Sequence, residues 1–515
     1  MMSVFSESVL DDDTSVFGSF VEELAPGLVL LLIADAVWGI PKMGFFGTIA
    51  ILCIGLVYYF FGRLNDWYSK KIFGGILPPF APGSMMKHME MATCGQYPWW
   101  LLEIANKSNS RVFRVSRPTK GHKCIVGEYQ VAREILTDPQ SKKPPAIYNQ
   151  MRYVNGSGDA SMFTLNGKRW HAKRRACVPA FSSSRVRKMN SIALEHTEAF
   201  LELLRNGDGV FDVSSDMQSL VLGAISESAF DYIMSPQEKK EFSESVRLSL
   251  IEYARNATVH TYRSWLGWLL PGRRRASVVA QRIRNIMIRV LKRYRESGET
   301  EGNRGTLIQL IASDDNAFRN DDEKLAQLVE FLVAGHDTTS YSISWALISL
   351  AKHPEIQTRL RDELSRMRPE NWSQSEYLRM CMKESTRLNP VSSSTSVRVI
   401  GRDIRTKGGY VIPKGSTCFL WFLLLSRDPS VFDDPDEYKP SRWENPTREM
   451  LDSFMPFSLG ARNCIGQTLA GAHLHTVVAR ICSEFELTVE DEGKVDFFMT
   501  LKPIGARLKV RRVSR

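Results

Sequence analysis

With 515 residues, of which 43% are hydrophobic, the chain suits a folded protein and exceeds one ordinary small domain, although a single large enzyme domain is possible. Its 8 cysteines are scattered without a CxxC pair, which argues against a disulfide framework or a zinc cluster and fits a reducing compartment. The net charge of +10 suits nucleic acid, an anionic membrane or an acidic protein. No nucleic-acid-binding motif is present, so we expect no nucleic-acid partner.

Residues 1–43 predict an acidic tail with a short apolar segment. The first 25 residues contain six Asp or Glu side chains and no Lys or Arg, so the rest of the chain is more basic than the total suggests. The apolar run from Leu28 to Ile40 is interrupted by Asp35. This run could lie at a membrane interface or form half of a hairpin. We expect one membrane span rather than two.

Residues 44–62 are the predicted transmembrane anchor. They form a run of 19 residues without a charge, which is about the length that a helix needs to cross a bilayer. Basic residues follow the run, which predicts that the rest of the chain is cytosolic. An uncleaved single-pass anchor fits better than a signal peptide, because the run is long and is followed by positive charge. A buried core helix is the alternative.

Residues 63–84 are basic and proline-rich, and they predict a stiff, extended linker between the anchor and the body. The body, residues 85–515, is predicted to be mainly α with small β-sheets. The expected elements are a strand pair at 111–115 and 123–127, a helix over Tyr129–Leu136, a loop over 140–165, helices over 168–390 and a hairpin over 409–420.

Two further stretches have open interpretations. Residues 264–272 form an apolar island with two tryptophans, which would suit either the core or a membrane interface. Residues 277–295 are apolar on one helical face and carry five arginines and a lysine elsewhere. This pattern is typical of a solvated surface helix.

One cysteine stands in an unusual setting. A single cysteine is most often a small buried hydrophobe. Here, however, Phe457, Gly460, Arg462, Cys464 and Gly466 form the pattern F-x-x-G-x-R-x-C-x-G. Glycines let the backbone turn sharply, an arginine suits a carboxylate, and the start of the following helix would lower the pKa of the thiol. The pattern resembles the haem-binding loop of the cytochrome P450 family.

That resemblance implies a fold and a role for each residue of the loop. It implies the cytochrome P450 fold over residues 85–515, with haem b as the cofactor. Cys464 would be the axial ligand of the haem iron, as a thiolate that favours O–O cleavage. Phe457 would shield the sulfur, Arg462 would pair with a haem propionate, and Gly460 and Gly466 would shape the loop.

Three more motifs occur in the order that the family shows. In "KESTR", Glu384 and Arg387 lie three residues apart on one helix face, which alone would predict a weak surface pair. The resemblance implies that they form a structural triad with Arg442 that supports the haem loop.

The second motif is "AGHDTTS", residues 334–340, inside an otherwise apolar helix. A helix that tolerates polar residues on an exposed face is the alternative, but flanking apolar residues suggest burial. The stretch looks like the family's oxygen-activation motif. Thr338 would then hydrogen-bond the bound dioxygen or its water, Asp337 would supply protons, and Gly335 would leave space above the iron.

The third motif is "WHAKRR", residues 170–175. Trp170 and Arg174 lie four residues apart on one helix face, and they match a family pattern in which both contact haem propionates. Arg398 is a further expected propionate contact, although its spacing from Glu384 is one residue longer than the usual pattern.

The resemblance implies a haem-thiolate monooxygenase that inserts one atom of O₂ into an organic substrate. The sequence has no G-x-G-x-x-G fingerprint, so electrons from NADPH are expected through a separate flavoprotein reductase, with cytochrome b5 as a further candidate donor. Lys173, Arg174 and Arg175 are candidates for the docking face. A peroxide isomerase or dehydratase that needs no reductase, and a non-enzymatic haem binder or electron carrier, are the alternatives. The presence of Asp337 and Thr338 argues against both.

The expected location is the endoplasmic reticulum membrane, with the catalytic domain in the cytosol. The anchor favours a lipophilic substrate such as a sterol, fatty acid, terpenoid or carotenoid. The fold does not choose among these substrates.

Overall fold

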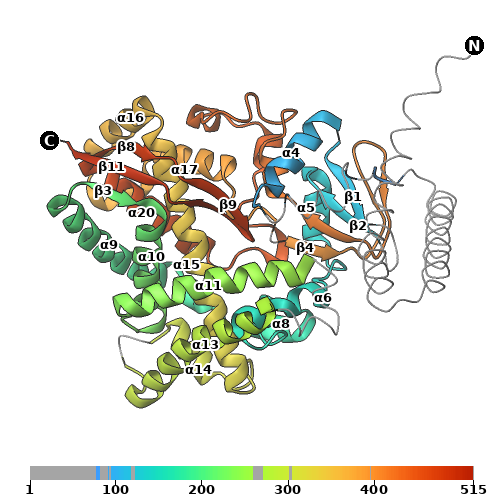
Figure 1. The fold of residues 1–515 in the computed structure, drawn as a ribbon, viewed down its shortest axis with the longest axis horizontal. Helices are drawn as coiled ribbons and strands as arrows, with labels where there is room; N and C mark the ends of the chain where they lie inside the picture. Colours follow the sequence, from blue (N-terminus) through green and yellow to red (C-terminus); the bar gives the residue numbers. More distant parts are fainter. Residues whose placement is uncertain are drawn as a thin grey trace, which may run out of the picture. The chain divides into compact units, whose positions relative to one another are not determined.

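The computed structural model describes residues 77–79, 81, 91, 94–108, 110–116, 122–258, 271–300, 304–394 and 396–513 (Figure 1). The chain divides into two compact units. The first contains residues up to Ala132 together with Val399–Leu420, and the second contains Arg133–Arg398 and Trp421–Arg515. The predicted anchor at 44–62 and residues 264–270 lie outside the described residues. None of the helices that the structure describes has the length and hydropathy of a membrane span.

The first unit is built around short strands. β1 (Val112–Ser116) pairs antiparallel with β2 (Lys123–Val126), and β2 pairs parallel with β7 (Thr417–Leu420), with Cys124 opposite Cys418. β5 (Ile404–Arg405) and β6 (Val411–Ile412) form a separate two-stranded ladder. Helix α4 (Tyr97–Ser108) belongs to this unit. Two elements are divided between the units: α5 (Tyr129–Thr137) belongs to the first unit up to Ala132, and β4 (Ser396–Val399) belongs to it only at Val399.

These strands confirm one prediction and correct another. The strand pair at 111–115 and 123–127 is confirmed as β1 and β2. The hairpin predicted over 409–420 is wrong, because its two strands belong to different sheets: β6 pairs with β5, and β7 pairs with β2. Both strands bury apolar side chains, and local pattern does not reveal which distant strand supplies the hydrogen bonds.

The second unit is mainly helical, which confirms the expected class. Three short helices, α6, η1 and α7, occupy part of the region predicted as a loop over 140–165. The helices of this unit are α6 (Pro145–Tyr148), η1 (Asn149–Met151), α7 (Arg152–Asn155), α8 (Gly167–Cys177), η2 (Val178–Phe181), α9 (Ser183–Asn206), α10 (Val213–Phe230), α11 (Pro236–Thr258), α13 (Pro271–Ser297), α14 (Leu307–Ser313), α15 (Asp321–Ala351), α16 (Pro354–Ser365), η4 (Pro369–Gln374), α17 (Glu376–Leu388), α18 (Phe422–Ser426), η5 (Pro440–Trp443), α19 (Arg448–Ser453), η6 (Gly460–Arg462) and α20 (Gln467–Glu484).

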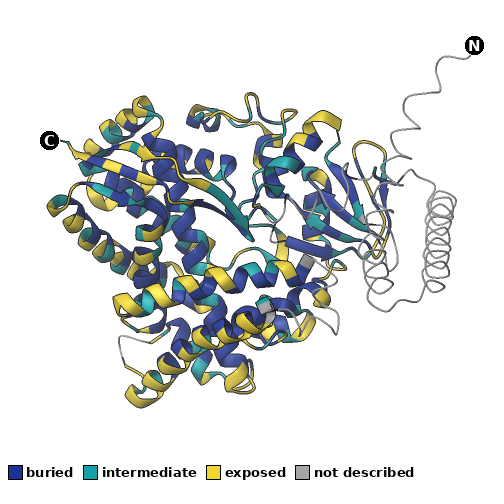
Figure 2. Ribbon diagram, viewed as in Figure 1, coloured by how far each residue is buried: buried dark blue, intermediate teal, exposed yellow. Residues whose placement is uncertain are grey.

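Helix α15 is the central helix of the second unit, and it contacts α10, α13, α17 and α20. The Asn320 side chain caps its first turn by accepting a hydrogen bond from the Glu323 amide at 3.0 Å. Three acidic residues in that turn complement the helix dipole. Nearly all of the helix after this turn is buried, as its dark colour in Figure 2 shows. The predicted helix over the "AGHDTTS" stretch is confirmed, but its burial is only partial: His336, Asp337, Thr339 and Ser340 are buried, whereas Ala334, Gly335 and Thr338 are not.

Two small sheets complete the second unit. β11 (Arg507–Arg512) lies between β3 (Val210–Asp212) and β8 (Phe485–Asp491), and all its pairings are antiparallel. β9 (Lys494–Phe498) and β10 (Thr500–Ile504) form a hairpin that turns at Met499, whose φ is 67°. β10 contacts α15, which brings side chains from near the C-terminus to the central helix.

Candidate active site

The loop before α20 holds Cys464 in a fixed backbone. The Cys464 amide donates to the Phe457 carbonyl at 2.9 Å, and the Asn463 amide donates to the Gly460 carbonyl at 3.1 Å. Gly460 has a φ of +71°, and a Cβ there would lie 2.5 Å from the Leu136 carbonyl oxygen. Only glycine meets both requirements without displacing the neighbouring backbone. The positive φ and the close approach to Leu136 therefore explain why the loop needs a glycine at position 460.

The surroundings of the Cys464 sulfur suit its use as a metal ligand. The side chain is exposed, yet burial raises the pKa of the thiol, so the sulfur is accessible and also closely surrounded by protein. The Gly466 amide hydrogen bond and the positive charge of Arg174 act in the opposite direction and favour the thiolate. A bound metal ion would shift the sulfur fully to the thiolate, because a thiol that coordinates a metal is deprotonated outright.

The predicted propionate contacts lie together in the second unit. Arg174 donates to the Asn463 carbonyl at 2.9 Å and to its side-chain oxygen at 2.7 Å, which ties α8 to the cysteine loop. The Arg462 guanidinium lies 3.7 Å from the centre of the Trp170 ring. Burial lowers the pKa of Arg462 to about 9, and the charges of Arg398 and Arg174 add to this effect. The structure therefore brings all four residues into one neighbourhood.

Lys143 is a member of this cluster that the sequence reasoning missed. It is buried, and burial lowers its pKa, as do the charges of Arg398, Arg462 and Arg174. Within the described part of the chain, no carboxylate lies at ion-pair distance from any of these four cations. A cofactor that carries two carboxylates would offset the repulsion, so the cluster fits the propionates of haem. The only sequence signal was a pair of lysines before two prolines.

One face of α15 is open while the rest of the helix is buried. From Glu323 to Ala351 the exceptions to burial are the residues that follow the spacing of one helical face. They are Phe331, Ala334, Gly335, Thr338 and Ser342. This face is mostly apolar and carries the Thr338 hydroxyl, which donates to the Ala334 carbonyl at 2.7 Å. It is suited to cover a flat cofactor and to hold an apolar substrate against it.

Gly335 has a packing reason of its own. A Cβ at this position would lie 2.9 Å from the Cδ1 atom of Ile225 on α10. The glycine therefore allows α10 and α15 to approach closely. The expectation that it leaves space above the iron rests on the family resemblance alone.

Asp337 lies off the open face. It is buried, its Oδ2 atom accepts a hydrogen bond from the Thr500 hydroxyl at 2.7 Å, and its Oδ1 atom lies 3.4 Å from the Lys502 ammonium group. Both partners come from β10. The structure thus places Asp337 next to Thr338 in the helix but directs its carboxylate toward the C-terminal hairpin. Sequence reasoning missed Thr500 and Lys502, because no local pattern links β10 to α15.

Glu384 is fully buried at the centre of a hydrogen-bond network. Its Oε1 atom accepts from Arg387 at 2.9 Å, from Arg442 at 2.8 Å and from the Lys439 amide at 3.0 Å. Its Oε2 atom accepts from Arg387 and from the Trp443 indole, both at 2.9 Å. The geometry thus forms the triad that the sequence predicted, with Trp443 as an added member.

Arg387 extends this network toward the chain that precedes the cysteine loop. Its guanidinium also donates to the carbonyl groups of Ser426, Pro435 and Glu437. The Trp443 ring contacts that of Phe454 at 4.8 Å, three residues before Phe457. The triad therefore holds the segment that leads into the loop.

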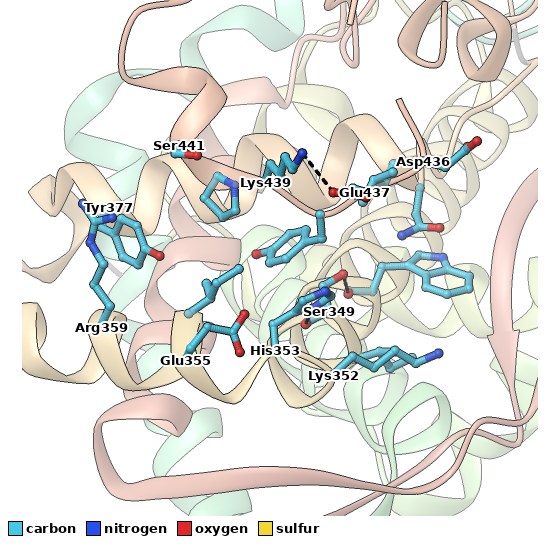
Figure 3. A pocket seen from close by; sticks show the side chains of 17 residues that line it. Ser349, Lys352, His353, Glu355, Arg359, Tyr377, Asp436, Glu437, Lys439 and Ser441 are labelled. Atoms are coloured by element: carbon cyan, nitrogen blue, oxygen red, sulfur yellow. Dashed lines mark hydrogen bonds and ion pairs between the residues drawn. The ribbon is translucent and has the colours of Figure 1, made fainter. Parts of the chain in front are cut away.

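A cavity of about 920 Å³ lies elsewhere in the second unit (Figure 3). The end of α15, the start of α16, helix α17 and the segment 436–441 line it. Its lining includes apolar residues such as Ile348, Ile356 and Leu388, and the charged side chains of Lys439 and Glu437 form an ion pair there. None of the predicted site residues lines this cavity, so we do not assign the reaction to it.

Comparison with known proteins decides the family. The sequence model of the family described as Cytochrome P450 matches residues 85–510. The chain belongs to the cytochrome P450 family. It is a cytochrome P450 monooxygenase, which uses haem and receives electrons that originate from NADPH through a reductase.

Several relatives align with about two thirds of this P450. Human cytochrome P450 4F8 is 29% identical over 64% of this chain and 69% of its own length. A human ultra-long-chain fatty acid omega-hydroxylase is 29% identical over 66% of this chain and 69% of its own. Rat cytochrome P450 4F6 is 30% identical over 65% of this chain and 68% of its own.

Different residues of this P450 would serve different roles at the haem site. When bound, haem supplies the iron at which dioxygen is activated. Cys464 would supply the thiolate ligand, the cations at Arg174, Arg398 and Arg462 would hold the carboxylates of the group, and Gly460 fixes the loop. The open face of α15 would exclude water with its apolar side chains, and it presents the hydroxyl groups of Thr338 and Ser342.

Proposed function

We propose that this P450 hydroxylates a lipophilic substrate, with a long-chain fatty acid as the first candidate. The observation that carries the proposal is the open face of α15, where Phe331, Ala334 and Gly335 lie around the Thr338 hydroxyl. The Phe181 ring lies 5.9 Å from the Phe331 ring, which extends the apolar surface. One relative is named as a fatty acid omega-hydroxylase, which supports this substrate class before sterols, terpenoids and carotenoids.

Spectroscopy and product analysis test this proposal together. The reduced protein with CO should show the red-shifted band of a thiolate-ligated haem, and Cys464→Ser should lose that band. Long-chain fatty acids should shift the haem spectrum on binding and be hydroxylated when a reductase and NADPH are present. Binding of sterols but not of fatty acids would reject the substrate class, whereas a histidine-like CO band would reject Cys464 as the ligand.

We further propose that Thr338 and Asp337 control the proton supply to bound dioxygen. Thr338 lies on the open face, where its hydroxyl oxygen can accept a hydrogen bond while its hydrogen is donated to the Ala334 carbonyl, and Asp337 is one residue before it. The Lys502 ammonium group lies 3.4 Å from the Asp337 carboxylate and holds it in place beside Thr338. A peroxide isomerase or an electron carrier would have no need for these groups, so their presence favours the monooxygenase.

The proposed docking face for the reductase lies on α8. Lys173 does not belong to it, because the Lys173 side chain is 1% exposed and bonds to Glu323 on α15 at 2.5 Å. Arg175 is exposed on α8, and Lys168 lies two helical turns before it on the same face. Arg174 ties this helix to the cysteine loop, so the face lies close to the site where electrons must arrive.

Charge reversal tests this face. The double variant Lys168→Glu and Arg175→Glu should raise the KM for the reductase several-fold, with the effect weakening at high salt. The matched control is Arg282→Glu, an exposed arginine on α13. Equal KM values for the double variant and the control would remove α8 from the docking face.

The membrane arrangement is also a proposal. We infer an acidic tail at 1–43, a single transmembrane anchor at 44–62, a linker at 63–84 and a haem-binding catalytic domain at 85–515 in the cytosol at the endoplasmic reticulum. The uncharged run and the basic residues that follow it support this arrangement. Protease treatment of sealed microsomes should digest the catalytic domain. Protection of that domain would place it on the opposite side of the membrane.

A further inference from the structure

A buried acid on α15 has no role in the motifs described above. Glu330 is 6% exposed and stands beside the open face of the helix, one residue before Phe331. A carboxylate in such a place is costly unless hydrogen bonds and opposite charge compensate it. Its partners therefore show what it does.

Glu330 binds the chain segment formed by residues 155–163. Its Oε1 atom accepts from the Asn155 side-chain amide at 3.1 Å and from the Ser161 hydroxyl. Its Oε2 atom accepts from the Phe163 amide at 3.2 Å. One turn earlier on α15, the Gln327 side chain accepts from the Met162 amide at 2.8 Å. Two side chains on one helix face thus hold four donors of this segment.

The same segment holds Lys143. The Lys143 ammonium group donates to the Phe163 carbonyl at 2.5 Å and lies over the rings of Phe163 and Tyr148, at 4.1 and 4.6 Å from their centres. Phe163 therefore connects the two charged groups: its amide binds Glu330 and its carbonyl binds Lys143. The negative charge of Glu330 also acts directly on Lys143 and favours its cationic form.

Other titratable groups near Glu330 agree with this arrangement. Burial raises the pKa of Glu330 to about 7, while its hydrogen bonds and the charge of Lys143 act in the opposite direction. Tyr253 on α11 also interacts with Glu330, and Tyr148 on α6 interacts with Tyr253. Lys143 is the cation whose charge acts on Glu330.

We propose that Glu330 is a positioning residue of the haem site. Its carboxylate fixes the segment 155–163 on α15 and, through Phe163, places the Lys143 ammonium group among the arginines that face the propionates. This inference rests on the proposed haem-thiolate function. It adds a fourth cation to the predicted propionate contacts and explains how a buried lysine is held beside three arginines.

The test uses the full-length holoprotein and the variant Glu330→Gln. Hydrogen exchange, followed by mass spectrometry, should be about tenfold faster in peptides covering residues 155–163, because a charge-assisted hydrogen bond is lost. Exchange in α10 should stay unchanged. Transfer of haem to apomyoglobin should also be faster, while the thiolate CO band remains in place.

Glu323→Gln is the matched control. Glu323 is a buried acid on the same helix, but it bonds Lys173 and Arg169 on α8. This variant should lower Tm and leave exchange in residues 161–163 unchanged; Asp159 is left out of this comparison because it lies 3.8 Å from Arg169, a partner of Glu323. Equal loosening of that segment by both variants, or no loosening by Glu330→Gln, would overturn the proposal. If Glu330→Gln does not fold, Ser161→Ala is used instead, because it removes one donor to the same carboxylate. An unchanged exchange rate in residues 155–163 of the Ser161→Ala variant would likewise overturn the proposal.

The result also separates this inference from the proposed function. A wild-type protein without a thiolate CO band would overturn the haem-thiolate function and, with it, the haem part of this inference. A normal band in the wild type, together with unchanged exchange in the Glu330 variant, would overturn the positioning role alone.

Discussion

Substitution of Glu384 by Gln should be among the most damaging single changes in the second unit. Glu384 and Arg387 are both 0% exposed, and the carboxylate accepts from three side chains and one backbone amide. A glutamine keeps the shape but removes the charge and directs an NH₂ group at donors. Breaking a buried ion pair by removing one partner costs about 3–5 kcal/mol, because the other charge is left uncompensated.

This loss is large compared with the total stability of a domain, which is about 5–15 kcal/mol. The free energy of unfolding is measured by denaturant titration, and the haem content is measured in parallel. We expect a lower midpoint and a lower haem content, because the network holds the chain that leads to the cysteine loop through Trp443 and Phe454.

The control for this prediction is Glu376→Gln in the first turn of the same helix. Glu376 is exposed, and its charge favours the helix dipole by only about 0.3–1 kcal/mol. If Glu384→Gln cost no more than this control, the reasoning that the buried network supports the haem loop would be refuted.

Three further predictions follow from the same structure. Thr338→Ala should keep the haem and the substrate-induced spectral change but divert electrons to peroxide or water, and tight coupling of NADPH use to product would contradict the proton role. Gly460→Ala should lower the haem content strongly, because its Cβ would collide with the Leu136 carbonyl and its φ is positive, whereas Gly471→Ala, which meets no atom within 4 Å, should not. Hydrogen bonds from Arg205 lower the pKa of Glu484 to about 2, so its contribution to stability is present above the unfolded pKa of about 4.3 and is lost as the pH falls toward 2. Denaturation at several pH values should show that Glu484→Gln flattens this part of the stability profile, and an unchanged acid limb would contradict the assignment.

Because the Asp337 carboxylate points to β10, its role in the proton supply can be tested separately from that of Thr338. Its carboxylate is bound by Thr500 and Lys502 of β10, so the C-terminal hairpin is coupled to the central helix. A variant of either residue therefore changes the environment of Asp337 without touching the open face of α15.

The sequence by itself determined that the cysteine loop, the Glu384–Arg387 pair and the Trp170–Arg174 pair each bring their residues close together. The members of each are in one loop or one helical turn apart, so spacing places them together, while their expected roles come from the family resemblance. It also predicted the helical class and the strand pair at β1 and β2, because hydrophobic periodicity is a local property.

Only the tertiary structure decided which charges are buried and what they bind. Lys173 reads as one more surface cation of a basic helix, but its partner Glu323 lies 150 positions away. The bonds of Asp337 to Thr500 and of Glu330 to Ser161 span 163 and 169 positions. The two strands at 409–420 look like one hairpin in the sequence, because the strands with which they pair are distant along the chain. Local spacing cannot reveal contacts that form only when distant segments pack, so burial, ion-pair partners and sheet pairing required the folded chain.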